Sequence, residues 1–241
     1  MKLCLAQTKP VRGAIEENIK AHIILIEEAT ALGADGIIFP ELSLTGYEPS
    51  LAAELAMGLG DERLHPFQQI SNEKHITIGV GMPVTAHAGI QIGMVLFRPG
   101  QPRQLYAKKY LHADEEPFFT SGENYTGLLI KNQPVAIAIC YELSIPQHAA
   151  DAHKRGDRIY IASVAKTASG VEKAQNTLAT TAGRYSMMVL MVNSVGMSED
   201  GLCAGTSCAW NNKGQLLGQL DATNEGLLLV DTTAQEIIIP S

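Results

Sequence analysis

The sequence predicts a layered α/β fold formed by a single domain over residues 1–241. Strand patterns alternate with helical patterns in the first and third quarters, and further strand patterns joined by turns lie between and after them. No linker, low-complexity segment or short-period repeat interrupts this succession. Hydrophobic residues make up 46% of the chain and charged residues 18%, which is ample material for one core.

The first quarter combines a strand, an amphipathic helix and a short buried strand. Isoleucines recur at helical spacing between Ile15 and Ala29, with glutamates on the opposite side, and Gly33 suits the left-handed position after a helix. A proline ends the next apolar segment, whose last residue is Glu41. The expected elements are a strand over 2–7, a helix over 15–29, a strand over 36–41 and weaker helices over 51–59 and 62–75.

The rest of the chain repeats these patterns and adds hairpins. Segment 98–101 is typical of a hairpin turn, and Pro146 suits the first turn of a helix. The turns at 211–214 and near 224–226 carry the Asn and Gly residues that hairpins need. The expected strands cover 76–81, 89–97, 104–109, 126–130, 135–139, 158–162 and 187–192, and the expected helices cover 145–155 and 170–185.

Charge and cysteine content argue against several classes of protein. A net charge of −7, with Lys and Arg scattered along the chain, argues against nucleic acid or a membrane surface as a partner. The first residues lack the apolar run of a secretory segment, and no run approaches the roughly 18 apolar residues of a membrane span. We therefore expect a cytoplasmic protein with four free thiols, at Cys4, Cys140, Cys203 and Cys208.

Cys140 ends the most apolar strand pattern of the chain. The five residues 135–139 are all apolar, which predicts a strand buried on both faces, and Tyr141 and Glu142 follow the cysteine. Open α/β sheets present their chemistry at the carboxyl ends of their strands. Free cysteine is also among the residue types most often buried, so this segment alone leaves a reactive and a packing role open.

Three predicted strands end in groups that suit a cysteine hydrolase, namely Glu41, Lys108 and Cys140. Such an enzyme needs a thiolate, a group that moves protons, and positive charge where the oxyanion develops. Histidine usually moves the protons, but His148 and His153 are five residues apart, a spacing that suits neither zinc nor a shared helix face. A Glu/Lys pair can do this work, because burial raises the pKa of the Glu while the Lys stays cationic.

Taken together, these segments resemble those of the nitrilase, or carbon–nitrogen hydrolase, superfamily. Each match is weak alone, but the matches occur in the family's order over nearly the whole chain. They are Phe-Pro-Glu at 39–41, Tyr-Ala-Lys-Lys-Tyr-Leu at 106–111, Glu115 with Phe-Thr-Ser-Gly at 119–122, Ile-Cys-Tyr-Glu at 139–142 with Pro146, and a weaker Gly-Thr-Ser at 205–207 with Asn211 and Gly214.

The resemblance implies a fold and a set of roles. The implied fold is a four-layer α-β-β-α sandwich, with Glu41 as general base, Lys108 as the ammonium beside the oxyanion and Cys140 as nucleophile. Glu115 matches the family's second glutamate near the lysine, and Tyr141 is expected to give its backbone N–H to the oxyanion. Lys108 is preferred to its neighbour because the family has Tyr-x-Lys with Leu three residues later, and because strand alternation sends adjacent side chains to opposite faces.

The implied reaction is the hydrolysis of a small amide, ω-amide or carbamoyl-amide. Glu41 takes the Cys140 proton, the thiolate attacks the carbonyl, ammonia or an amine leaves, and water hydrolyses the thioester. The resemblance implies no metal or organic cofactor, and it implies a homodimer or higher homo-oligomer paired through outer helices. The expected partner is thus a small amide-type molecule, with no nucleic acid and no membrane.

Several positions depart from the family's pattern in places that shape the pocket. Many members have an arginine where this chain has Ser144, and segments 163–167 and 181–185 lack the family's common residues. The substrate is therefore open. Lys166, just past a strand end, is a candidate for binding a substrate carboxylate, and a solvated loop lysine is the competing interpretation. The role of Lys173 in substrate binding is left open.

Other functions compete with the amidase. A nitrilase would act on nitriles with the same chemistry, and a catalytically silent binding or scaffold protein would keep only the fold. The complete set of Glu41, Lys108 and Cys140 disfavours the silent protein, because a decayed site would lose at least one member. A Cys–His protease or a thiol redox protein is disfavoured because the chain has no Cys-x-x-Cys and no histidine in a comparable motif.

Overall fold

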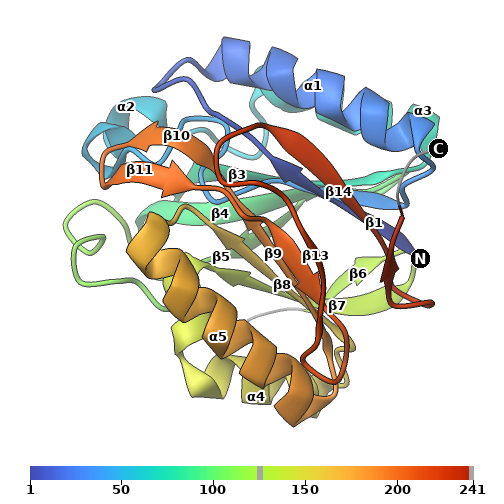
Figure 1. The fold of residues 1–241 in the computed structure, drawn as a ribbon. Coiled ribbons are helices and arrows are strands. Elements are labelled where there is room, and N and C mark those ends of the chain that lie inside the picture. Colours follow the sequence, from blue (N-terminus) through green and yellow to red (C-terminus); the bar gives the residue numbers. More distant parts are fainter. Residues whose placement is uncertain (124–126, 239–241) are drawn as a thin grey trace.

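Two β-sheets lie face to face, and helices cover their outer faces (Figure 1). The structure is a computed structural model that describes residues 1–123 and 127–238. The layers run α-β-β-α, with α1 at the top of Figure 1 and α4 and α5 at the bottom. This arrangement confirms the four-layer α/β sandwich.

The first sheet carries the amino-terminal half of the chain. Within the described residues it has seven strands in the order β15-β14-β1-β2-β3-β4-β5. Strands β1 to β3 are mutually parallel, and their neighbours on both sides are antiparallel. The strands are β1 (Lys2–Gln7), β2 (Gly36–Ile38), β3 (Thr77–Ala86), β4 (Gly89–Phe97), β5 (Gln104–Ala107), β14 (Gly226–Asp231) and β15 (Glu236–Ile237). The helices of this half are α1 (Ile15–Ala31), α2 (Ala52–Leu55) and α3 (His65–Lys74), with single 3₁₀ turns at Pro49–Leu51 and Glu62–Leu64.

The second sheet carries Cys140. Among the described residues it has six strands in the order β13-β12-β9-β8-β7-β6, and β7, β8 and β9 are parallel. The strands are β6 (Leu128–Ile130), β7 (Gln133–Ile139), β8 (Ile159–Val164), β9 (Met188–Asn193), β12 (Cys208–Trp210) and β13 (Leu216–Gln219). Its outer face is covered by α4 (Pro146–Arg155) and α5 (Ala168–Tyr185), and a separate ribbon is formed by β10 (Val195–Ser198) and β11 (Gly201–Ala204).

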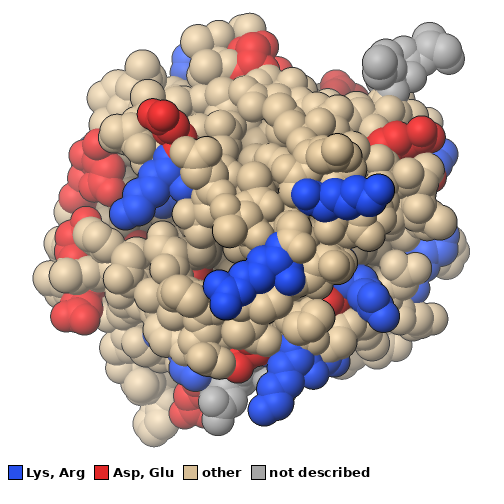
Figure 2. Space-filling model, turned by 60° about the horizontal axis from the view of Figure 1, so that its bottom comes forward, with Lys and Arg blue, Asp and Glu red and all other residues tan. Residues whose placement is uncertain are grey.

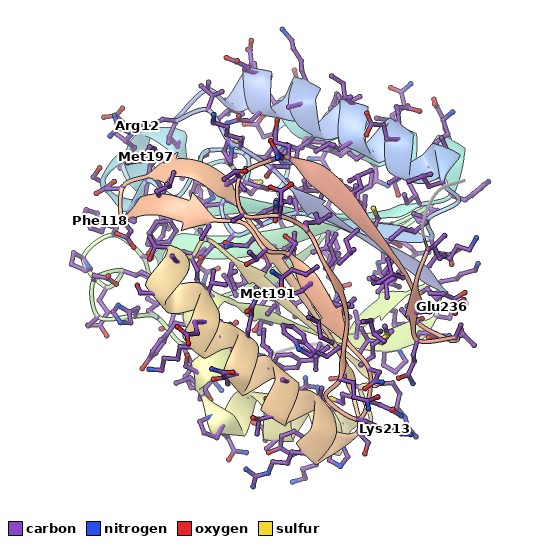
Figure 3. The ribbon with its side chains drawn as sticks, in the orientation of Figure 1. Arg12, Phe118, Met191, Met197, Lys213 and Glu236 are labelled. Carbon is purple, nitrogen blue, oxygen red and sulfur yellow. The ribbon has the colours of Figure 1, made fainter. Side chains whose placement is uncertain are left out.

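Alternation along the strands divides the core into layers. Leu3 and Leu5 of β1 pack between the two sheets, whereas Cys4 and Ala6 face α1 and α3. In β7, Val135, Ile137 and Ile139 pack between the sheets, and two small alanines lie under α4 and α5. All five residues 135–139 are buried, which confirms the strand buried on both faces. Met191 of β9, labelled in Figure 3, packs in the layer between the second sheet and helices α4 and α5.

Most predicted elements form, with shifted ends. Helix α1 ends as expected before Gly33, whose φ is +75°. The expected strand at 36–41 is paired only over Gly36–Ile38, and the expected helix at 51–59 only forms over Ala52–Leu55. The expected strand at 126–130 appears as Leu128–Ile130, and residue 126 lies outside the described residues.

One predicted hairpin is wrong. The turn at 211–214 joins β12 to β13 as a hairpin, as expected. The segment near 224–226 instead leads from β13 in the second sheet to β14 in the first, where β14 pairs with β1. Turn chemistry shows that the chain bends there, but it carries no information about which strand the next segment joins.

The outer face formed by α4 and α5 carries mixed charge. Lys and Arg side chains are spread over this face, and most of the surface between them is uncharged (Figure 2). None of the helices in the described residues combines the length and the apolar character needed to cross a membrane.

Candidate active site

Glu41 follows β2 on an irregular segment that crosses over β3. A Cβ atom on Gly81 of β3 would lie 2.2 Å from the Pro40 carbonyl oxygen, so only glycine allows the two backbones to approach this closely. Leu42 then takes a left-handed φ of +50°. From the second sheet, the Ser163 hydroxyl donates to the Phe39 carbonyl at 3.0 Å. These contacts hold the Glu41 side chain in the buried space between the two sheets.

Lys108 is the first residue after β5, and its backbone is held on both sides. Its N–H donates to the Ile92 carbonyl at 2.8 Å, and its own carbonyl accepts from Gly122 at 2.7 Å. The side chain is buried, and its Nζ donates to Glu41 Oε1 at 2.8 Å and to Glu115 Oε1 at 2.6 Å. Lys109, by contrast, is exposed, as strand alternation predicted.

Glu115 is buried, and hydrogen bonds occupy both of its oxygens. Oε1 accepts from Lys108 and from the Tyr47 hydroxyl at 3.0 Å, and Oε2 accepts from the His112 backbone N–H at 2.8 Å. Glu116, the next residue of the same acidic loop, is exposed. The structure therefore brings Glu115, and not its neighbour, onto the Lys108 ammonium.

Cys140 begins a 3₁₀ turn, Cys140–Ser144, directly after β7. Its φ of +44° is a left-handed conformation that non-glycine residues rarely adopt and that is common at functional sites. Cys140 is partly exposed, whereas Cys4, Cys203 and Cys208 are buried. Burial, followed by the charge of Glu41, raises the pKa of the Cys140 thiol to about 12, although Lys166 and Lys108 oppose the shift.

The charges of Glu41, Lys108 and Cys140 are interdependent. Burial and the charge of Glu115 raise the pKa of Glu41, and Lys108 opposes them. Burial alone would lower the pKa of Lys108, but the nearby acidic groups outweigh it and hold the pKa above its usual value. Glu41 Oε2 is buried and has no hydrogen-bond partner within the described residues. One oxygen of this carboxylate is therefore available as an acceptor.

A cavity of about 620 Å³ opens onto Cys140. Tyr47, Glu115 and Tyr141 line it together with Lys166, Lys173 and Asp200. Lys166 is held through its backbone, because its N–H donates to Asn193 Oδ1 at 2.8 Å and its carbonyl accepts from Asn193 Nδ2 at 3.1 Å. Met197 of β10 and Phe118, both exposed, project from the same margin of the molecule (Figure 3).

Sequence reasoning missed several residues of this region. Tyr47 contacts Glu115 and Asn193 holds Lys166, and neither belongs to a pattern that predicts such contacts. Glu142 is buried beside Cys140; it belongs to the motif at 139–142, but that motif gave it no role. The glycine-serine turn noted at 205–207 is structural: the Ser207 hydroxyl donates to Gln7 Oε1 at 2.9 Å and accepts from the Asn193 N–H at 3.0 Å. Over residues 1–123 and 127–238, no three His, Cys, Asp or Glu side chains gather as a metal ion would require.

Comparison with known structures supports the fold. The amidase from Nesterenkonia sp. AN1, in a variant solved in complex with butyramide, superposes with a TM-score of 0.87 over 98% of this chain and 92% of that chain, at 22% identity. Another variant of that amidase, which shows the Michael addition of acrylamide at its active-site cysteine, gives a TM-score of 0.87 at 21% identity, over 96% of this chain and 92% of that chain.

Sequence comparison finds curated relatives of two kinds. A glutamine-dependent NAD(+) synthetase from Synechocystis sp. is 27% identical over 95% of this chain and 45% of its own length, so the chain spans less than half of that relative. An (R)-stereoselective amidase from Pseudomonas sp. is 25% identical over 90% of this chain and 80% of its own length. The profile of the carbon-nitrogen hydrolase family matches residues 2–238. The chain therefore belongs to the carbon–nitrogen hydrolase family, which confirms the resemblance seen in its motifs.

Proposed function

We propose that this protein hydrolyses a non-peptide carbon–nitrogen bond of a small amide through a thioester on Cys140, with Glu41 as general base and Lys108 at the oxyanion. The observation that carries the proposal is the hydrogen bonding of the two Glu41 carboxylate oxygens. Oε1 accepts from Lys108, whereas the buried Oε2 has no partner among the described residues. A base that must accept a proton needs such an open oxygen, and the charge of Glu41 raises the pKa of the Cys140 thiol.

The raised pKa of Cys140 sets the order of the proton transfer. Because the pKa of the Cys140 thiol is raised, the thiol keeps its proton at neutral pH and needs a base to remove it for attack. The proton therefore moves to Glu41 as the sulfur–carbon bond forms. The raised pKa of Glu41 makes it a stronger base for this transfer than an exposed carboxylate.

Lys108 and the Tyr141 backbone N–H stabilise the negative charge that develops on the carbonyl oxygen. Lys108 stays cationic because Glu41 and Glu115 lie within hydrogen-bond distance of its Nζ. The Tyr141 N–H is in the first turn of the 3₁₀ segment, where backbone donors have no acceptor within the turn. Glu115 holds Lys108 in place and transfers no proton, because both of its oxygens are occupied.

The remaining steps return the enzyme to its starting state. Glu41, now protonated, gives its proton to the leaving nitrogen as the carbon–nitrogen bond breaks, and ammonia or an amine departs. Water then attacks the thioester while Glu41 accepts its proton, and the tetrahedral intermediate collapses to a carboxylic acid and the free Cys140 thiol.

A carboxylated amide is the substrate class that the cavity favours. The Lys166 ammonium has no hydrogen-bond or ion-pair partner within the described residues, and it lines the same cavity as Cys140. Curated relatives named as glutamine-dependent act with an amide that also carries a carboxylate, which agrees with this assignment. Replacing Lys166 by alanine should raise KM for a carboxylated amide and leave KM for its uncharged analogue unchanged.

The test is intact-mass spectrometry during turnover, with ammonia measured in parallel. Wild type is incubated with small amides, carbamoyl compounds and nitriles, beside Cys140→Ala and the control Cys203→Ala, which removes a buried thiol. An acyl adduct on Cys140 that Cys140→Ala lacks and Cys203→Ala keeps is the expected result. An adduct formed only with nitriles would make the protein a nitrilase. An adduct on another cysteine, or none with any compound, would contradict the proposal and favour a silent binding protein.

A further inference from the structure

Glu142 is a buried acid next to the catalytic turn that the proposed reaction does not use. It lies two residues after Cys140, and its carboxylate accepts hydrogen bonds from four donors. Oε1 accepts from the backbone N–H of Lys109 at 2.7 Å and from that of Tyr110 at 3.3 Å. Oε2 accepts from the backbone N–H of Ile139 at 2.8 Å and from the Tyr106 hydroxyl at 2.6 Å.

These donors come from the two segments that carry the proposed reacting groups. Lys109 and Tyr110 directly follow Lys108 at the end of β5 in the first sheet. Ile139 directly precedes Cys140 at the end of β7 in the second sheet. A single carboxylate therefore ties the backbone beside the ammonium to the backbone beside the thiol, across the boundary between the two sheets.

His148 extends the hydrogen bonds of Glu142 into a chain in which each group donates to the next. Its Nε2 lies 2.9 Å from the Tyr106 hydroxyl, and its Nδ1 lies 2.8 Å from the Tyr160 hydroxyl. The Tyr106 proton points to Glu142, so the Tyr106 oxygen accepts from His148 Nε2–H, and in neutral His148 the bare Nδ1 accepts from Tyr160. Burial lowers the pKa of His148, which agrees with a neutral ring. The hydrogen bonds thus run in one direction, from Tyr160 through His148 and Tyr106 to Glu142.

We propose that Glu142 is a positioning residue for hydrolysis, which fixes Lys108 relative to Cys140, and that His148 supports it through Tyr106. This inference rests on the roles proposed for Lys108 and Cys140. A displacement of about 1 Å between reacting groups can cost roughly a hundredfold in rate. Glu142 and its four hydrogen bonds, here called the clamp, should therefore act on kcat and not on substrate affinity.

Glu142→Gln is the most informative variant. Glutamine keeps the shape of the side chain but has one acceptor oxygen, so its NH₂ group must face either the two N–H donors after Lys108 or the two donors at Ile139 and Tyr106. One of the two segments is then released. The expected effect is a fall in kcat of at least about tenfold with KM changed less than about twofold. The matched control is Asp151→Asn, which changes a carboxylate on α4 that accepts from Gln147 Nε2 at 2.6 Å.

The neighbouring side chains supply graded variants in case Glu142→Gln does not fold. Tyr106→Phe removes one donor and should lower kcat by roughly threefold or more, and His148→Leu should act similarly. His148→Gln can still donate to Tyr106 and should recover most of the loss. His153→Leu, at an exposed histidine on the same helix, should have no effect. Combining Glu142→Gln with Tyr106→Phe should cost less than the product of the two single effects.

The readout that separates this inference from the proposed function is alkylation of Cys140 by iodoacetamide, followed by intact mass and peptide mapping. It needs no substrate. Slower alkylation of Cys140 in Glu142→Gln, Tyr106→Phe and His148→Leu, at unchanged thermal unfolding midpoints, supports the clamp even if no tested amide is hydrolysed. Wild-type alkylation rates in all three folded variants would overturn it, as would a loss of activity that lies entirely in KM.

Discussion

Two buried carboxylates flank Cys140, and they differ in how their oxygens are occupied. Glu41 pairs with the Lys108 ammonium through one oxygen, and its other oxygen has no hydrogen-bond partner within the described residues. Glu142 accepts from four donors, three of them backbone N–H groups. An incompletely satisfied carboxylate has an oxygen open to an incoming proton, whereas a carboxylate that accepts four hydrogen bonds holds the groups that donate to it. The difference indicates a chemical role for Glu41 and a geometric role for Glu142.

Glu41→Gln should have the largest effect on catalysis, and it tests whether Glu41 has the chemical role. Glutamine still accepts from Lys108 but cannot take the Cys140 proton, so the rate of acylation should fall by about 10³-fold. Rapid-quench intact-mass measurements would give this rate. Glu48→Gln, at a buried acid that pairs with Arg12 at 2.8 Å, is the control that should keep the wild-type rate. A rate for Glu41→Gln within tenfold of wild type would show that another group takes the proton.

Lys108→Met tests whether the Lys108 ammonium balances the charges of Glu41 and Glu115. Two carboxylates are then buried without their cation, which should lower the free energy of unfolding by about 3–5 kcal/mol at neutral pH and abolish measurable turnover. Without the ammonium the pKa of Glu41 rises further, so the folded state binds protons more tightly than the unfolded state. The stability of this variant should therefore recover as the pH falls.

Denaturant titrations from pH 7 to pH 5 would measure that recovery. Lys109→Met, at the exposed neighbouring lysine, should change neither stability nor its pH dependence. A pH-independent loss in Lys108→Met would mean that repacking, and not unpaired charge, destabilises the protein.

Tyr47→Phe tests the hydrogen bonding of Glu115, the second acid that contacts Lys108. The Tyr47 hydroxyl donates to Glu115 at 3.0 Å, in the way that Tyr106 donates to Glu142. Its removal should cost about 1–3 kcal/mol of stability, because the acceptor is charged and buried. The Lys108 bond remains, so kcat should fall less than tenfold. Chemical denaturation and steady-state kinetics on the same sample would separate the two effects, and a larger fall in kcat would place Tyr47 in the reaction itself.

The smallest expected effect is a pH dependence that originates at His148. Its pKa is lowered in the folded state, chiefly by burial, with Lys109 and Arg155 adding to the shift and Glu142 and Asp151 opposing it. Below the ordinary histidine pKa of about 6.5 the unfolded chain takes up a proton that the folded protein does not. As the pH decreases below this value, the free energy of unfolding should therefore decrease by up to about 1.4 kcal/mol per pH unit, until the lowered pKa is reached. His148→Gln should remove this contribution and His153→Gln should not, which thermal unfolding between pH 7 and pH 5 would show.

Much of the site could be predicted because its parts are local. Glu41, Lys108 and Cys140 each end an apolar strand pattern, and each lies at or just beyond a strand end in the structure. Alternation along 104–109 separated the buried Lys108 from the exposed Lys109. The roles of these residues stay predictions, since contact and burial define a geometry and not a reaction.

The sequence was sufficient to predict the layered α/β arrangement, because the periodicity of apolar residues along a strand or helix indicates which side chains avoid water. It also determined family membership, through the order and spacing of short motifs. Only the tertiary structure decided which segments meet. It sent the segment after residue 224 to the first sheet, left Glu41 Oε2 without a partner and brought Glu142 against the segments beside Lys108 and Cys140. These outcomes depend on contacts between residues distant in the chain, whose energies no local pattern encodes.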